Sequence, residues 1–135
     1  MTTLPKDAIE CISILQRKTG AHAVDCVINE SVVFAIPSGQ MGLAIGKGGE
    51  NVRKLSQLFK KKVEIVEYSD DFNSFAKNLA SPATPKKIEL KDGVLYIEAE
   101  GKSKYLLKGD KGKLLKRMKL FLERHYGSIT KVEVI

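Results

Sequence analysis

The chain has 135 residues, of which 43% are hydrophobic and 29% charged, and its net charge is +7. This composition predicts a folded chain with room for one ordinary domain or two small ones, and it excludes a disordered protein. No apolar run approaches the roughly 18 residues of a membrane span, and the start, MTTLPKDAIE, lacks the apolar core of a signal peptide, so we expect a cytoplasmic protein.

The first half of the chain predicts a helix, a hairpin, two further helices and a strand. Apolar residues at 8, 11, 12 and 15 have the i, i+3, i+4, i+7 spacing of an amphipathic helix that ends near Gly20. Strands over 23–28 and 31–36 flank a turn at Asn29-Glu30, and a β-branched strand follows over 63–66. Between them lie a short apolar helix, a glycine-rich turn and a longer helix. We expect the stripe of that longer helix to be core: Val52, Leu55, Leu58 and Phe59.

The second half repeats this order about 63 residues later. Apolar residues at 72, 75, 76 and 79 predict a helix with N-cap candidates at 69–71, and the helix ends near Pro82. Strands over 87–90 and 94–99 flank Asp92-Gly93, a strong hairpin signal because both residues tolerate positive φ angles. A short helix, a second glycine turn, a longer helix and a strand over 132–135 complete the repeat. The core stripe of the last helix is Leu115, Met118, Phe121 and Leu122.

Basic residues are concentrated around the two glycine turns. Residues 39–62 contain six Lys or Arg and one acid, and residues 102–119 contain eight Lys or Arg and one acid. The rest of the chain carries a net charge of −5. Because an evenly solvated surface would spread its charges, this placement predicts an acidic polymer as the partner.

The first glycine turn, Gly46-Lys47-Gly48-Gly49, has three candidate interpretations. A P-loop needs GxxxxGK followed by Ser or Thr, and a dinucleotide fingerprint needs GxGxxG between a strand and a helix. Neither pattern fits, and the turn lies between two helices. The third interpretation is the GxxG turn of a KH domain, which clamps about four nucleotides. Glycines let a sugar-phosphate backbone approach closely, and the next helix directs free N–H groups at the phosphate.

The element order α-β-β-α-α-β with GxxG between the second and third helices occurs twice. It predicts an α+β fold of two tandem prokaryotic-type (type II) KH domains, residues 1–68 and 69–135. The join at 68–71 contains no flexible Gly/Ser linker. We therefore expect the two domains to pack together with a short rigid join.

Two segments, GLAIGKGGENVRKL (42–55) and VEIVEYSDD (63–71), resemble the archaeal NusA-like transcription proteins, which consist of two type II KH domains and little else. The resemblance extends over essentially the whole chain. It implies single-stranded RNA binding in transcription termination or antitermination.

We expect both glycine turns to contact RNA, the second less tightly. The second turn is Gly109-Asp110-Lys111-Gly112, and Asp110 places a negative charge where phosphate should lie. Alternatively, Asp110 caps the following helix. The surrounding cations, among them Arg117, should keep the local field positive. The expected contact residues are Ile45, Gly46, Lys47, Gly48, Gly49, Asn51, Arg53 and Lys54 in the first half, and Lys108, Gly109, Lys111, Gly112, Lys113 and Lys116 in the second.

Other interpretations remain open at this point. The glycines could simply shape tight interhelical turns, and the alternative function is a KH-fold module that binds polymerase or ribosomal partners with little RNA affinity. No set of nucleophile, base and orienting group predicts an enzyme. Cysteines 11 and 26 with His22 lack a fourth zinc ligand. We expect no cofactor, no small-molecule substrate and no membrane contact, a monomer, and RNA polymerase as the candidate protein partner. Three tyrosines are expected to pack rather than stack on bases: Tyr96, Tyr105 and Tyr126.

Overall fold

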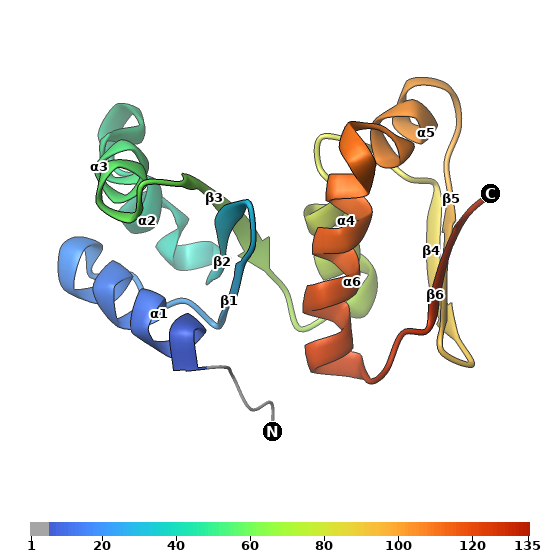
Figure 1. The fold of residues 1–135 in the computed structure, drawn as a ribbon, viewed down its shortest axis with the longest axis horizontal. Helices are drawn as coiled ribbons and strands as arrows, with labels where there is room; N and C mark the ends of the chain where they lie inside the picture. Colours follow the sequence, from blue (N-terminus) through green and yellow to red (C-terminus); the bar gives the residue numbers. More distant parts are fainter. Residues whose placement is uncertain (1–5) are drawn as a thin grey trace. The chain divides into compact units, whose positions relative to one another are not determined.

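The computed structural model describes residues 6–135. Residues 1–5, part of the start for which no signal peptide is expected, lie outside the described part. The chain forms two units, and the boundary between them in the sequence falls between Ser69 and Asp70. Both units have the expected order α-β-β-α-α-β. Figure 1 shows the elements along the chain.

The first unit is built on a mixed three-stranded sheet. Its strand order is β1-β2-β3, with β2 antiparallel to β1 and parallel to β3. A parallel pair needs a crossover connection, and two helices with the glycine turn between them supply it. The elements are α1 (Lys6–Thr19), β1 (Asp25–Ile28), β2 (Ser31–Pro37), α2 (Met41–Ile45), α3 (Glu50–Phe59) and β3 (Lys62–Tyr68), with short 3-10 turns at Ser38–Gln40 and Lys47–Gly49.

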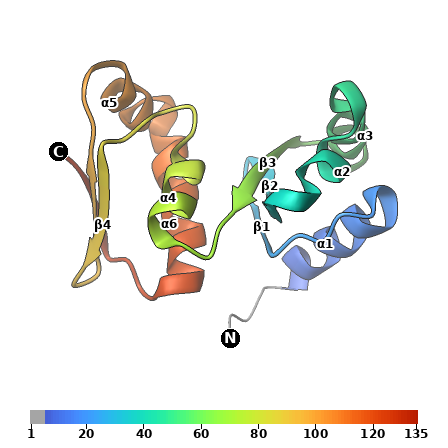
Figure 2. The ribbon, with the colours of Figure 1, turned by 180° about the vertical axis from the view of Figure 1, so that it is seen from behind.

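All three helices of the first unit pack on one face of this sheet (Figure 1), and Figure 2 shows the same unit from behind. Side chains alternate between the two faces of a strand, so every second strand residue points toward the helices. Each of α1, α2 and α3 packs one of its faces against these residues. The core consists of Ala8, Leu15, Ala21, Cys26, Val32, Phe34, Ile36, Ala44, Leu55 and Val63.

Leu58 is not part of this core, contrary to the sequence prediction. Its side chain is 52% exposed. At 100° per residue, Val52, Leu55 and Phe59 lie within one narrow sector of α3, whereas Leu58 lies about 60° outside it. The expected stripe of this helix was therefore one residue too wide.

The second unit repeats the topology with a sheet of order β4-β5-β6, in which β5 is antiparallel to β4 and parallel to β6. Asp71 is the N-cap of the first helix, and its carboxylate accepts hydrogen bonds from the Ser74 N–H and hydroxyl, both at 2.9 Å. Asp92 (φ 51°) and Gly93 (φ 77°) form the expected primed hairpin turn. The elements are α4 (Phe72–Ala80), β4 (Lys87–Lys91), β5 (Val94–Glu98), α5 (Gly101–Lys108), α6 (Lys113–Tyr126) and β6 (Lys131–Val134), with a 3-10 turn at Asp110–Gly112.

Helices α4 and α6 lie side by side over one face of the second sheet, as both ribbon views show (Figures 1 and 2). Phe75 and Phe121 pack edge to face between these helices, with ring centroids 6.0 Å apart. The predicted stripe of α6 is confirmed for Met118, Phe121 and Leu122, which are fully buried. No helix within residues 6–135 is long and apolar enough to cross a membrane.

Candidate nucleic-acid interface

The first glycine turn joins the end of α2 at Ile45 to the start of α3 at Glu50. Three of its four residues have positive φ angles: Gly46 at 76°, Gly48 at 61° and Gly49 at 77°. Residues with a Cβ rarely adopt this backbone conformation, so the sequence GKGG is what permits the turn.

Gly46 and Gly48 are glycines for different reasons. A Cβ on Gly46 would lie 2.8 Å from Cγ of Asn51 and 2.9 Å from its backbone nitrogen, so no side chain fits there. A Cβ on Gly48 would meet nothing within 4 Å. Gly46 thus allows the close approach of α3, whereas Gly48 leaves the outer surface of the turn open to a ligand.

Two side chains from α3 hold the turn in place. Arg53 Nη1 donates to the Gly48 carbonyl at 2.7 Å, and Asn51 Nδ2 donates to the Leu43 carbonyl at the end of α2 at 2.8 Å. Both residues are among the expected RNA contacts, and the structure gives both an intramolecular role. Because the turn is braced in advance, an incoming ligand does not have to order it.

The local charge favours an anion. The N-cap of α3, Gly49, contributes no side-chain hydrogen bond, so the first N–H groups of the helix are not taken up by a capping side chain. Lys47 is exposed on the turn. Lys54 pairs with Glu50 at 2.9 Å, and the hydrogen bond and charge of Lys54 lower the pKa of Glu50. Both side chains of that pair are largely in water, so the pair is weak and leaves Lys54 able to turn to a phosphate.

Apolar surface lies immediately before the turn. Leu43 is 51% exposed and Ile45 is 36% exposed, both on α2. Ile45 is one of the expected RNA contacts, and Leu43 is an additional exposed apolar side chain beside it.

The second glycine turn has a different backbone. Its positive φ angles occur at Asp110 (51°), Lys111 (57°) and Gly112 (72°), whereas Gly109 has φ −80°. Gly109 is thus in a conformation open to any residue, and two residues with side chains occupy the left-handed region. An L-residue in that region costs about 1–2 kcal/mol, with Asp among those that tolerate it best.

The second turn also lacks the braces of the first. The position of Asn51 is taken by Leu114, whose side chain has no amide. The side chain of Lys116, at the position of Arg53, makes no hydrogen bond within the described residues. Gly112, not Asp110, is the N-cap of α6, and no side chain caps this helix. The alternative role of Asp110 as the cap of this helix is therefore not observed.

Arg117 was wrongly counted among the surface cations. Only 8% of it is exposed. Its Nε and Nη2 donate to the Leu79 carbonyl at 3.0 and 2.6 Å, and Nη2 also donates to the Ser81 carbonyl at 2.7 Å. Arg117 therefore satisfies the carbonyls at the end of α4 and is a structural residue.

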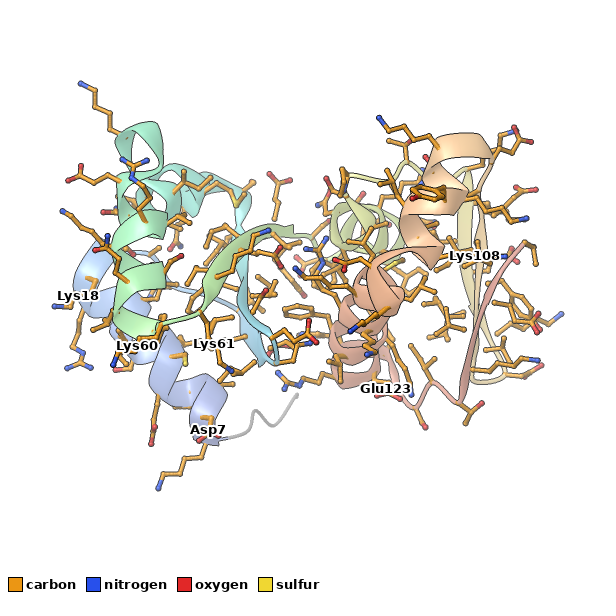
Figure 3. The ribbon with its side chains drawn as sticks, turned by 45° about the horizontal axis from the view of Figure 1, so that its top comes forward. Asp7, Lys18, Lys60, Lys61, Lys108 and Glu123 are labelled. Atoms are coloured by element: carbon orange, nitrogen blue, oxygen red, sulfur yellow. The ribbon has the colours of Figure 1, made fainter. Side chains whose placement is uncertain are left out.

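The remaining cations expected at the second turn are distributed over its two helices and the turn itself. Lys108 lies at the end of α5 (Figure 3), and Lys111 lies on the turn. Lys113 and Lys116 follow on the first turns of α6. Together they outnumber the single acid, Asp110.

Tyr105 was expected to pack, but the structure leaves it 77% exposed on α5. Tyr105 lies 200° around the helix from the buried Leu107, and Lys104 and Lys108 flank it. By contrast, Tyr126 does pack, edge to face against Phe72 with ring centroids 5.0 Å apart.

The two units belong to one structural class. Residues 12–70 match the family model described as KH domain. The second unit has the same element order and the same mixed sheet. Two helices joined by a glycine turn beside such a sheet define the KH class, here in its type II order. No cluster of His, Cys, Asp or Glu able to hold a metal ion occurs within residues 6–135.

Curated relatives narrow this class to a family. A protein named "Probable transcription termination protein NusA" from Methanocaldococcus jannaschii is 39% identical, covering 98% of this chain and 74% of that protein. Proteins of the same name are 37% identical in Methanococcus vannielii, over 78% of this chain and 64% of that protein, and 30% identical in Halobacterium salinarum, over 91% of each. A solved structure, the crystal structure of APE1850, is 27% identical and covers 98% of this chain and 100% of that one, with a TM-score of 0.83. The chain belongs to the archaeal NusA-like family.

Proposed function

We propose that this chain is a single-stranded RNA-binding protein that acts in transcription termination or antitermination. The observation that carries the proposal is the first glycine turn, where an open Gly48 surface is fixed by Arg53 and Asn51 beside an uncapped helix start. This arrangement suits a sugar-phosphate backbone, because it offers N–H groups and positive charge without a side chain in the way.

The preference for a single strand follows from what lies next to the clamp. Exposed Leu43 and Ile45 offer apolar contacts that only unpaired bases can reach. In a duplex the bases are stacked and paired inside the helix, so phosphate contacts alone would remain. The role in transcription rests on the names of the relatives, which are probable transcription termination proteins.

The remaining parts of the proposal extend it to the whole chain. We propose KH domains over residues 1–68 and 69–135, each contributing its glycine turn and nearby cations to the RNA surface. The same proposal includes a monomeric, cytoplasmic protein that needs no cofactor, performs no enzymatic reaction and contacts RNA polymerase while holding RNA.

A filter-binding titration tests the proposal. A 12-nucleotide unstructured RNA and a duplex of the same length are titrated at two salt concentrations. We expect the single strand to bind at least about tenfold more tightly than the duplex, and both affinities to fall with salt. Equal affinity for the two, or a folded protein without RNA affinity, would contradict the proposal. The second result would favour the alternative, a KH-fold module for protein partners.

A further inference from the structure

We infer that Tyr105 is a stacking platform for an unpaired RNA base, so that the second unit holds RNA by stacking and charge rather than by a braced glycine clamp. The inference rests on the proposed RNA-binding function and adds a contact that the glycine turns do not supply. It assigns a binding role to a residue outside both turns.

The exposure of Tyr105 sets it apart from other aromatic residues of the second unit. Phe75 and Phe121 are buried and pack on each other, and Tyr126 packs on Phe72. The Tyr105 ring has no such aromatic partner among the described residues and is 77% exposed. An aromatic face open to water is the surface on which an unpaired base stacks, and stacking tolerates any base because every base has a π face.

A shallow groove lies beside this ring. It has a volume of about 340 Å³ and is lined by Gly101, Lys104, Tyr105, Lys108 and Gly109. A Cβ on Gly101 would meet nothing within 4 Å, so space is open at that end of the groove. At the other end Gly109 begins the second glycine turn. A base on Tyr105 would therefore be part of the same strand that passes the turn.

The charge of the groove fits the phosphates of that strand. Lys108 is three residues after Tyr105 and so lies on the same side of the helix, and Lys104 lines the same groove. No carboxylate lines the groove, and neither lysine forms an ion pair within residues 6–135. Lys108 lies at the end of α5 (Figure 3). Two ammonium groups beside an exposed aromatic face match a nucleotide, which carries a flat base and a phosphate.

The corresponding positions in the first unit show that this is a feature of the second unit alone. Sixty-three residues before Tyr105 lies Gly42, and Lys108 corresponds to Ile45. The first unit has a braced turn and apolar neighbours. The second has an unbraced turn, and it carries an aromatic ring and two cations instead.

Substitutions at Tyr105 test the inference directly. Tyr105→Phe keeps the ring, Tyr105→Leu keeps apolar surface without a π face, and Tyr105→Ala removes both. With a 12-nucleotide single-stranded RNA, we expect Tyr105→Phe to bind within about twofold of the wild type. Tyr105→Leu and Tyr105→Ala should bind about 5- to 20-fold more weakly, the lower part of the range for a stacked base. Thermal melts should be unchanged because the side chain packs on little.

An RNA of the same length with abasic riboses separates stacking from charge. On it all three variants should bind like the wild type, because no base is present to stack. Equal losses on the abasic and the base-bearing RNA would overturn the inference. So would a Tyr105→Ala protein that binds the base-bearing RNA as tightly as the wild type, and this second result would leave the proposed function intact. A wild type that binds neither RNA would refute both the inference and the proposed function. That result would favour the alternative function, binding of a protein partner.

Intrinsic fluorescence gives an independent measurement. The chain has four tyrosines and no tryptophan, so its emission is that of tyrosine. A stacked base should quench Tyr105 on RNA addition, and Tyr105→Phe should bind RNA while losing that part of the quenching. Identical quenching in wild type and Tyr105→Phe would count against the contact.

Discussion

Individual residues of the first turn divide into those that shape it and those that face outward. Gly46, Asn51 and Arg53 have contacts within the turn, whereas Lys47 and Gly48 lie on its open side. This division tells which substitutions report on binding and which report on folding. Lys47 and Gly48 are therefore the positions at which to test the clamp.

Changing Lys47 and Gly48 together to Asp should abolish most of the binding by the first turn. Two carboxylates would face the phosphate, and we expect RNA affinity to fall by at least about tenfold, or some 1.4 kcal/mol. Asp tolerates the positive φ angle at position 48, and space for its side chain is available there. Filter binding and a thermal melt of the same sample are the measurements.

The matched control replaces both residues with Asn. Lys47→Asn with Gly48→Asn has the same shape as the Asp pair and tolerates the same backbone, but it lacks the negative charges. We expect a loss of about two- to fourfold from the missing lysine alone. If both double variants keep wild-type affinity while folded, the GKGG turn is not the clamp.

Substitutions at two adjacent basic residues of α6 should affect different properties, one the RNA affinity and the other the stability of the fold. Lys116→Ala removes an exposed cation, so RNA affinity should fall by about two- to fivefold while stability changes by less than about 0.5 kcal/mol. Arg117→Ala leaves the Leu79 and Ser81 carbonyls without their donor, so unfolding should become easier by about 2–4 kcal/mol. Urea denaturation and RNA titration of both variants separate the roles. A stable Arg117→Ala protein with weakened RNA binding would show that this side chain is not structural.

At the scale of elements, the two helix-turn-helix segments share a sequence pattern but not a backbone. Gly46 has φ 76° and ψ 168°, a region almost restricted to glycine, whereas Gly109 has φ −80° and ψ 178°. The backbone angles therefore require glycine at the first position of GxxG in the first unit but not in the second. In the second unit, the demand for positive φ falls on the next three residues.

Alanine at the two first glycines should reveal this difference. Gly46→Ala places a Cβ 2.8 Å from Asn51 and forces a strained φ, so we expect a loss of at least about 2 kcal/mol of stability. Gly109→Ala has an unstrained φ, and its Cβ would lie 3.1 Å from the Tyr105 carbonyl oxygen and 4.0 Å from that of Leu106, so its loss should stay within about 1 kcal/mol. Denaturant melts compare the two. Equal losses would show that the turns have the same backbone in solution.

Asp110 offers a test of whether the second turn meets phosphate. Asp110→Asn removes the charge and keeps a residue that tolerates φ 51°, so RNA affinity should rise by about two- to threefold. Asp110→Lys should gain about 3- to 10-fold at low salt but lose up to about 1 kcal/mol of stability from the strained φ. A folded Asp110→Lys protein with unchanged affinity at low salt would mean that the second turn does not contact the RNA.

The sequence predicted the elements well and individual surfaces less well, for physical reasons. Repeating apolar spacing and the Asp92-Gly93 hairpin are local signals, and local signals determine element order. The burial of Arg117 depends on carbonyls 36 and 38 residues away, which no local pattern reveals. Leu58 was placed by the i, i+3 spacing, although it lies about 60° outside the buried sector of its helix. Which side of α5 faces the core depends on tertiary packing, so the exposure of Tyr105 is not a local signal either.

At the scale of the whole molecule, the placement of charge decides how binding responds to salt. The net charge of +7 arises from basic segments around the two glycine turns on an otherwise acidic chain. Each phosphate that Lys or Arg neutralises releases its condensed counterions. Binding should therefore weaken linearly on a log–log plot of affinity against salt, and the slope counts the phosphates that are neutralised.

If the cations of both units take part, roughly 4 to 6 phosphates should be neutralised, and the slope for single-stranded RNA should be about −3 to −4. The Lys47→Asp, Gly48→Asp protein should give a slope less steep by about 0.7 for each phosphate that it no longer neutralises. The Tyr105→Ala protein should give the wild-type slope, because stacking releases no counterions. Titrations of the three proteins over a series of salt concentrations measure this. A flat slope would exclude a phosphate clamp. A wild-type slope near about −1.5 would mean that the cations of only one unit reach the RNA, since this slope corresponds to about two neutralised phosphates.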